Sequence, residues 1–408
     1  VGEVVGPREV RGTLVILLST VVVVLSGPHC EADFDSALLL FLLVARLHPV
    51  ADVGLFAVVL GLWLAVRSLG PLGFDQAAMR FIPAFRAEGR SWAAAAFVRI
   101  ALLWIGLPAV LAGAILVDTV WLAVALGVVS VFALYRALLF IHEISHLHRD
   151  ALPGFRTAWN ALVGVPMLTP SFMYEGVHTL HHKRTQYGTI EDPEYLPLAL
   201  MKPWSLPAFV LIALLAPAAL LFRFAVLVPL GAIIPPIRRL TWQRLSALAI
   251  NPDFRRRPPE GDLRPRVVLQ EVGGMLWSWA LIGSVFAFGW KPLLVAFAVA
   301  SVVALLNQLR TLVAHLWENE GEAMTVTAQF LDSVNVPPPG MIAELWAPVG
   351  LRYHALHHLL PSLPYHSLTT AHRRLIAELG TGSTYDRSNY PGMLMLVGRI
   401  AKSTMRVG

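Results

Sequence analysis

Long apolar runs separated by short polar turns dominate the chain and predict helices that cross a membrane. A membrane-spanning helix needs about 20 apolar residues. Two hairpins meet this requirement. Residues 92–116 pair with 121–141 across a turn at Asp118, and residues 272–288 pair with 293–309 across a Gly-Trp-Lys-Pro turn. The chain is 56% hydrophobic and only 14% charged, whereas soluble domains carry about 25% charged residues. We therefore expect an integral membrane protein.

Three further apolar stretches are harder to place from the sequence. Residues 14–25 and 37–66 predict additional N-terminal membrane segments, although 14–25 also fits the core of a signal peptide. Residues 206–234 are long enough to cross, but prolines and Arg223 interrupt them. A single crossing there would also place the last histidine motif on the opposite face. An interfacial or re-entrant segment is the interpretation that we favour.

These segments predict the fold class and its regions. The fold is expected to be all-α: a helical bundle of two main transmembrane hairpins, extra N-terminal and interfacial apolar segments, and a cytoplasmic histidine-rich cap. Residues 1–75 form N-terminal membrane segments, residues 76–380 the membrane domain with its site, and residues 381–408 a peripheral C-terminal tail.

Charge and composition predict where the protein resides. Both hairpins begin and end on the side that carries most loop arginines, so this side is expected to be cytoplasmic. The net charge of +6 suits an anionic membrane surface better than nucleic acid. The single cysteine excludes an intramolecular disulfide. Composition rich in Ala, Leu, Val and Arg is typical of a GC-rich bacterial genome, so we expect a bacterial inner membrane.

Three short histidine motifs carry the candidate chemistry, with eight of the 14 histidines. Imidazole is the commonest protein ligand of borderline transition metals. Helix positions i, i+3 and i+4 share one face, so each motif is expected to present its ring nitrogens to a single point. The motifs are His142-Glu-Ile-Ser-His146, His178-Thr-Leu-His181-His182 and His354-Ala-Leu-His357-His358.

Two metal chemistries fit these motifs. The first motif reads His-Glu-x-x-His, as in intramembrane zinc proteases, and Asp332 could supply a third ligand. One zinc needs three protein ligands, which leaves the other two motifs unused. A two-metal centre uses all three, with His315 as a ninth ligand. Iron is the expected metal, because breaking an unactivated C–H bond requires redox chemistry that zinc cannot perform.

The combined motifs resemble the membrane fatty acid desaturase superfamily, which has three histidine boxes of these spacings. The segments 176–182, 191–195 and 353–366 carry the resemblance, and Pro361 and Pro364 follow the third box as in that family. It covers roughly residues 92–379. It implies a helical bundle with a non-haem diiron centre that an acyl chain reaches through an apolar channel.

The resemblance also implies roles for individual residues. His315 corresponds to the isolated histidine before the third box, and Thr311 occupies the position of a water-binding asparagine in some members. The family's other metal ligands correspond to His142, His146, His178, His181, His182, His354, His357 and His358. Neutral ligands leave the metals' positive charge unbalanced, so nearby carboxylates are expected to compensate. The candidates are Glu143, Glu175, Asp192 and Glu318.

The reaction implied is the introduction of a C=C bond into a fatty acyl or lipid chain, with O2 as co-substrate and two non-haem iron ions as cofactor. The alternative is a hydroxylase or ketolase of an alkane, carotenoid or sphingoid lipid. No catalytic residue is expected beyond the metal centre. The sequence shows no cytochrome b5, dinucleotide-binding or ferredoxin motif. We therefore expect a separate electron donor, of ferredoxin, rubredoxin or cytochrome b5 type, with its reductase.

Overall fold

A computed structural model describes residues 110–148, 154–261, 263–339 and 342–407. They belong to one compact unit, Leu107–Gly408. The apolar stretches 14–25 and 37–66, the start of the first hairpin and the 75/76 boundary lie outside the described residues. Within the described part of the chain every regular element is helical.

The helices follow one another closely along the chain. Their bounds are α6 Val120–His146, α7 Phe155–Trp159, η1 Asn160–Gly164, η2 Ser171–Met173, α8 His178–His181, η3 Leu198–Leu200, α9 Ser205–Leu211, η4 Ile212–Leu215, α10 Ala216–Phe222, η5 Arg223–Leu227, α11 Val228–Ile233, α12 Pro235–Leu245, α13 Leu263–Phe288, α14 Lys291–Leu312, α15 Val326–Asp332, α16 Ala343–Trp346, α17 His354–Leu359, α18 Tyr365–Leu379, η6 Asp386–Ser388 and α19 Met393–Val407.

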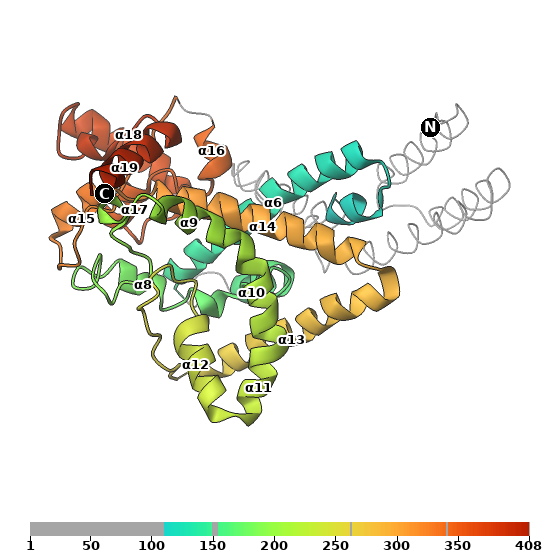
Figure 1. Ribbon diagram of the computed structural model, residues 1–408. Helices are drawn as coiled ribbons and strands as arrows, with labels where there is room; N and C mark the ends of the chain where they lie inside the picture. The colour runs from blue at the N-terminus through green and yellow to red at the C-terminus, as the bar shows by residue number, and fades with distance from the viewer. Residues whose placement is uncertain (1–109, 149–153, 262, 340–341, 408) are drawn as a thin grey trace, which may run out of the picture. The chain divides into compact units, whose positions relative to one another are not determined.

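The long helices α6, α13 and α14 form the membrane framework, as the apolar runs predicted (Figure 1). α13 is followed by Gly289, whose positive φ of 73° suits glycine. Pro292 lies in the first turn of α14, where a backbone N–H would have no partner within the helix. Nζ of Lys291 lies 3.1 Å from the carboxylate of Asp118. The turns of the two hairpins therefore lie together, at the end of the framework opposite the histidines.

α6 is longer than the predicted span and continues through the first histidine motif. Its 27 residues extend about 40 Å at 1.5 Å per residue, against a hydrocarbon layer of about 30 Å. α6 packs on α14 through Leu134, Val299 and Val303, and the loop around Val349 closes this apolar core. The last turn of α6 therefore emerges from the span in a fixed position.

Residues Ser205–Ile233 are helical throughout, but the helix changes type at the 3-10 helix η4 and at the π-helix η5, close to the prolines and to Arg223 where the sequence predicted interruptions. In Figure 1 this segment passes from α14 to α13, remote from their connecting turn. Gln308 donates to the carbonyl of Phe209 at one end, and Trp279 donates to the carbonyl of Ala225 further along. The prolines lie in first turns, and Arg223 pairs with the buried carboxylate of Glu271 at 2.8 Å. Neither feature breaks the helix.

The polar cap follows α14 and includes the C-terminal segment. Isolated β-bridges join His315 to Ser333, and Asn335 to both Tyr353 and Asn389. Leu396 of α19 is buried in an apolar cluster with residues from the segment after α14. The predicted tail, 381–408, thus includes a helix packed on the cap.

Candidate metal centre

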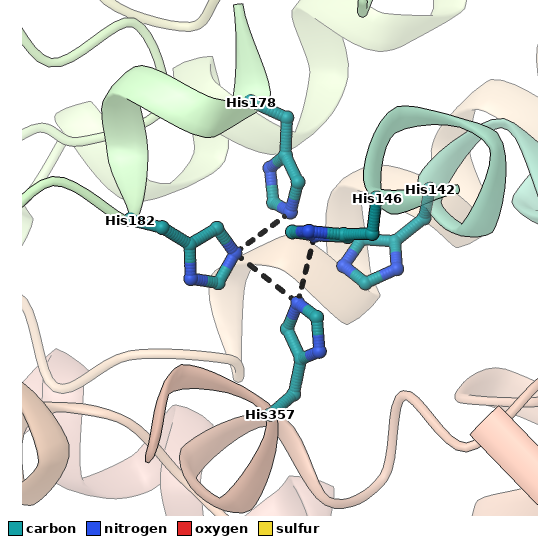
Figure 2. Close-up of side chains that lie close together, drawn as sticks. All are labelled: His142, His146, His178, His182 and His357. Atoms are coloured by element: carbon teal, nitrogen blue, oxygen red, sulfur yellow. Dashed lines mark hydrogen bonds between the residues drawn. The ribbon is translucent and has the colours of Figure 1, made fainter. Parts of the chain in front are cut away.

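Nine histidine side chains meet in two adjacent groups at the ends of α6 and α14. Within each group one nitrogen of every ring lies within 4.8 Å of the corresponding nitrogens of the other rings. Figure 2 shows the rings of the first group directed toward a common point. The first group is His142, His146, His178, His182 and His357; the second is His181, His315, His354 and His358.

The prediction that each motif serves a single point is wrong for the two His-x-x-His-His motifs. His178 and His182 belong to the first group, while His181 belongs to the second. Residues i and i+4 are separated by about 40° around a helix, but i+3 and i+4 by about 100°. Short helices placed between the groups therefore send neighbouring histidines in different directions. The third motif divides likewise, with His357 in the first group and the other two in the second.

Backbone contacts fix the helices and the loop that carry these rings. The Asn335 side chain accepts a hydrogen bond from the backbone N–H of Leu356, inside the third motif. His315 is held by its bridge to Ser333, and the next N–H donates to the Asp332 carbonyl at 2.7 Å. Because Asn335 also bridges to Asn389, the C-terminal segment helps to position both the third motif and His315.

The spacing of the rings fits metal ligation. Two ligand nitrogens at about 2.1 Å from one metal, at a right angle, lie about 3.0 Å apart. The Nε2–Nε2 distances are 2.9 Å for His178–His182, 3.1 Å for His146–His357 and 3.0 Å for His315–His354. Both ring nitrogens of His142 are buried without a hydrogen-bond partner. Rings that converge on Nε2 while leaving such atoms unpaired are typical of a metal site, so the residues present fit two bound metal ions.

Carboxylates orient two rings of the second group, His181 directly and His315 through a tyrosine, at their Nδ1 atoms. Asp192, fully buried, accepts from Nδ1 of His181 at 2.9 Å. Nδ1 of His315 lies 2.8 Å from the Tyr187 hydroxyl, which donates to Asp332 at 2.7 Å. These bonds place the proton on Nδ1 and leave Nε2 free for a metal.

The first group has a corresponding partner in Glu194. Its carboxylate accepts from Nδ1 of His178 at 2.8 Å and from the Tyr174 hydroxyl at 2.8 Å. Glu194, Tyr187 and Asp332 were not among the predicted charge-compensating residues. Glu194 lies in the 191–195 segment that carried the resemblance, so its place in the motif was the available signal.

Of the other predicted partners, only Glu143 lies near a ring of the two groups among the described residues. Glu175 contacts no histidine and instead pairs with Arg156 at 3.0 Å and Arg266 at 3.1 Å. Glu143 accepts from the backbone N–H of Tyr365 at 3.2 Å, and its carboxylate is 3.7 Å from Nδ1 of His142. Thr311 accepts from the neighbouring Arg310. Glu318 pairs on the surface with Arg399.

Burial controls the protonation of the rings in the cap. It holds the pKa of His178, His182 and His357 well below the usual value, and neighbouring imidazoles lower it further. Burial also opposes charge on His181, but the Asp192 carboxylate raises the pKa of His181 above its usual value. Burial raises the pKa of Glu194 to about 7. Neutral imidazole is the form that binds a metal, so most of the rings are ready for ligation at neutral pH.

The metal-free protein is expected to lose stability as the pH falls below about 6.5, the usual pKa of histidine. Its buried imidazoles, such as His354 and His358, stay neutral because burial lowers their pKa. The unfolded chain takes up protons from that pH downward, so the free energy of unfolding decreases with falling pH and is insensitive to these groups above it. Thermal unfolding in detergent at a series of pH values measures this. The metal-loaded protein is the control, and it should stay folded to a lower pH than the metal-free protein. A constant midpoint for the metal-free protein would contradict it.

Comparisons with known proteins agree with the geometry. The family model described as "Fatty acid desaturase" matches residues 119–389, the range that contains all nine histidines. The chain is 51% identical over 297 residues to the ceramide hydroxylase of Caulobacter vibrioides (strain NA1000 / CB15N), covering 71% of this chain and 84% of that protein. No solved structure matches. With its membrane helices and histidine clusters, the chain belongs to the fatty acid desaturase family.

Proposed function

We propose that this membrane enzyme hydroxylates the chain of a ceramide or a closely related sphingolipid. The observation that carries the proposal is the 51% identity to a ceramide hydroxylase, over most of both chains. This corresponds to the alternative that the sequence left open, a hydroxylase of a sphingoid lipid, rather than to the desaturase that was expected first. The nine clustered histidines supply the chemistry that either reaction needs.

The proposed reaction consumes one O2, two electrons and two protons. A C–H bond of the lipid becomes C–OH, and the second oxygen atom leaves as water. Two iron ions, held by His142, His146, His178, His182 and His357 on one side and by His181, His315, His354 and His358 on the other, would supply the redox chemistry that activates O2.

The surrounding residues hold this set in place and balance its charge. Asp192, Glu194 and Asp332 are linked to the rings directly or through a tyrosine hydroxyl, and would offset the charge of two dications bound by neutral ligands. Tyr174 and Tyr187 each donate to one of these carboxylates. They keep the carboxylates directed toward Nδ1 of the rings.

The two electrons are proposed to come from a separate protein of ferredoxin, rubredoxin or cytochrome b5 type with its reductase. The centre is proposed to face the cytoplasm, where such donors are reduced. Arginines such as Arg244 of α12 and Arg255 in the loop after it would attract an acidic donor.

Desaturation is the second candidate, and the family match favours it. There a second C–H bond is cleaved, a C=C bond forms and both oxygen atoms leave as water. The ligand set is the same for both reactions. The outcome depends on how the chain lies at the centre, so the product has to be measured.

Expression in a ceramide-producing bacterium is expected to yield a ceramide that is one oxygen heavier than in the empty-vector control. Mass spectrometry of total lipids, with tandem fragmentation, measures the gain and locates the hydroxyl group. The His354→Ala variant is the inactive control, because it lacks one ligand of the second group. If the product is instead a ceramide or acyl lipid that is two hydrogens lighter, the reaction is a desaturation and not a hydroxylation. Unchanged lipids in a host with a competent electron donor would contradict both candidates.

A further inference from the structure

Arg310, in the last turn of α14, is a buried cation without a carboxylate partner among the described residues. Its side chain is 8% exposed. Its one hydrogen bond goes from Nη2 to the hydroxyl of the adjacent Thr311, at 3.1 Å, and its Nε is buried with no partner. A guanidinium has five N–H donors, and among the described residues the Thr311 hydroxyl is the acceptor found for Arg310, while Nε is left without one.

Other buried arginines of the structure make more hydrogen bonds than Arg310 does, although Nη1 of Arg223 is also buried without a partner. Arg223 donates to Glu271, to Ser246 and to a backbone carbonyl. Arg352 donates to Glu344 at 3.0 Å and to the carbonyl of Val336 at 2.7 Å. A buried donor without an acceptor costs free energy. The buried Nε of Arg310 therefore points to an acceptor that the described residues do not supply.

A narrow cavity next to Arg310 offers a place for that acceptor. Its walls are mainly apolar and include Val313, Trp346 and Leu351, and the polar side chains of Arg352 and His354 also border it. It leaves about 10 Å³ for the centre of a water-sized group, about the minimum for one such group. Nδ1 of His354 is buried without a partner as well. The cavity thus suits a single oxygen atom and is too small for an acyl chain.

The acceptor need not be an anion, because a neutral carbonyl oxygen also accepts N–H groups. What Arg310 lacks is an oxygen that accepts its N–H groups. A lipid amide carbonyl supplies such an oxygen on an otherwise apolar molecule, and Arg310 lies at the end of a membrane-spanning helix.

We propose that Arg310 binds the amide carbonyl oxygen of the lipid substrate in this cavity, next to His354 of the second histidine group. The inference rests on the proposed function, because a ceramide carries the amide. By holding the carbonyl at one point, Arg310 would determine which carbon of the chain reaches the metals. It would also favour amide-linked lipids over lipids without a carbonyl. Arg310 is thus a specificity-determining residue that does not bind metal.

Lipid binding under anaerobic conditions tests the proposal without turnover. The iron-loaded protein in detergent is titrated with a short-chain ceramide and with a matched ether lipid, in which –O–CH2– replaces the amide. Binding is followed by the shift of the thermal unfolding midpoint. Arg310→Met is expected to weaken ceramide binding by about tenfold or more, the loss typical of a charge-assisted hydrogen bond. Binding of the ether lipid should change little, and Arg310→Lys should lie between Arg310→Met and the wild type.

Two controls separate this role from a structural one. Arg239→Met removes an exposed arginine of α12 and should leave both affinities unchanged. The iron content of Arg310→Met should equal that of the wild type. An equal loss for both lipids, no loss for either, or loss of iron would overturn the proposal. Equal loss or no loss would indicate that an ordered water, not the lipid carbonyl, occupies the cavity. Loss of iron would indicate that Arg310 supports the metal centre.

The two proposals fail separately. If ceramide binds through Arg310 but the cellular product is desaturated, the proposed reaction is wrong and the carbonyl site stands. If ceramide is hydroxylated while Arg310→Met binds both lipids like the wild type, the carbonyl site is wrong and the reaction stands.

Discussion

The His357→Ala variant is expected to lose iron from the first centre and to lose lipid oxidation almost completely. The Nε2 atom of His357 lies 3.1 Å from Nε2 of both His146 and His182, so this ring links the first and second motifs. Loss of an outer hydrogen-bond partner of a metal ligand costs about 10- to 100-fold in metal affinity or activity. Loss of the ligand itself should cost more, and both metals are needed for the two-electron chemistry.

Iron content and Mössbauer spectra of purified protein, with the lipid product assay, measure this effect. His366→Ala is the matched control, because this exposed histidine lies just beyond the third motif and outside both groups. His358→Ala provides a sharper comparison. This variant alters the residue next to His357, but it should remove iron from the second centre and not from the first. If both variants lost the same spectral component, the division of the motif between two centres would be refuted.

The Asp192→Asn variant is expected to weaken metal binding at the second centre by about 10- to 100-fold. Asp192 accepts from Nδ1 of His181 and from the backbone N–H groups of Gly188 and Glu194. A neutral amide keeps the shape but supplies only one acceptor oxygen and removes a full negative charge. The ring of His181 then loses both its orientation and the carboxylate that makes it a stronger ligand.

Chelator competition with iron or cobalt measures the affinity of the second centre, and product formation should fall with it. Glu191→Gln is the control: this exposed neighbour of Asp192 contacts Gln186 on the surface and no histidine. An Asp192→Asn protein with wild-type metal affinity would show that Asp192 supports only the local turn.

The membrane framework was predictable because its cause is local in sequence. A run of about 20 apolar residues satisfies its backbone as a helix and buries its side chains in lipid. The hairpin of α13 and α14 and the turn at Asp118 follow from such runs. In Ser205–Ile233 the predicted interruptions coincide with changes of helix type, and the carboxylate of Glu271, distant in sequence, accommodates Arg223.

The membrane helices, the three histidine motifs and the kind of chemistry they support could be predicted from the sequence, since spacing and residue type carry that information. How the motifs divide between the two groups depends on tertiary contacts. His181 and His182 are adjacent in the chain, yet the packing of the short helices against α6 and α14 sends them to different centres. The partners of the rings also came from packing: Glu194 rather than Glu175 reaches a histidine, because the distant Arg156 and Arg266 engage Glu175. Which side chains share a helix face follows from the helical period, but what that face meets depends on contacts between segments far apart in the chain.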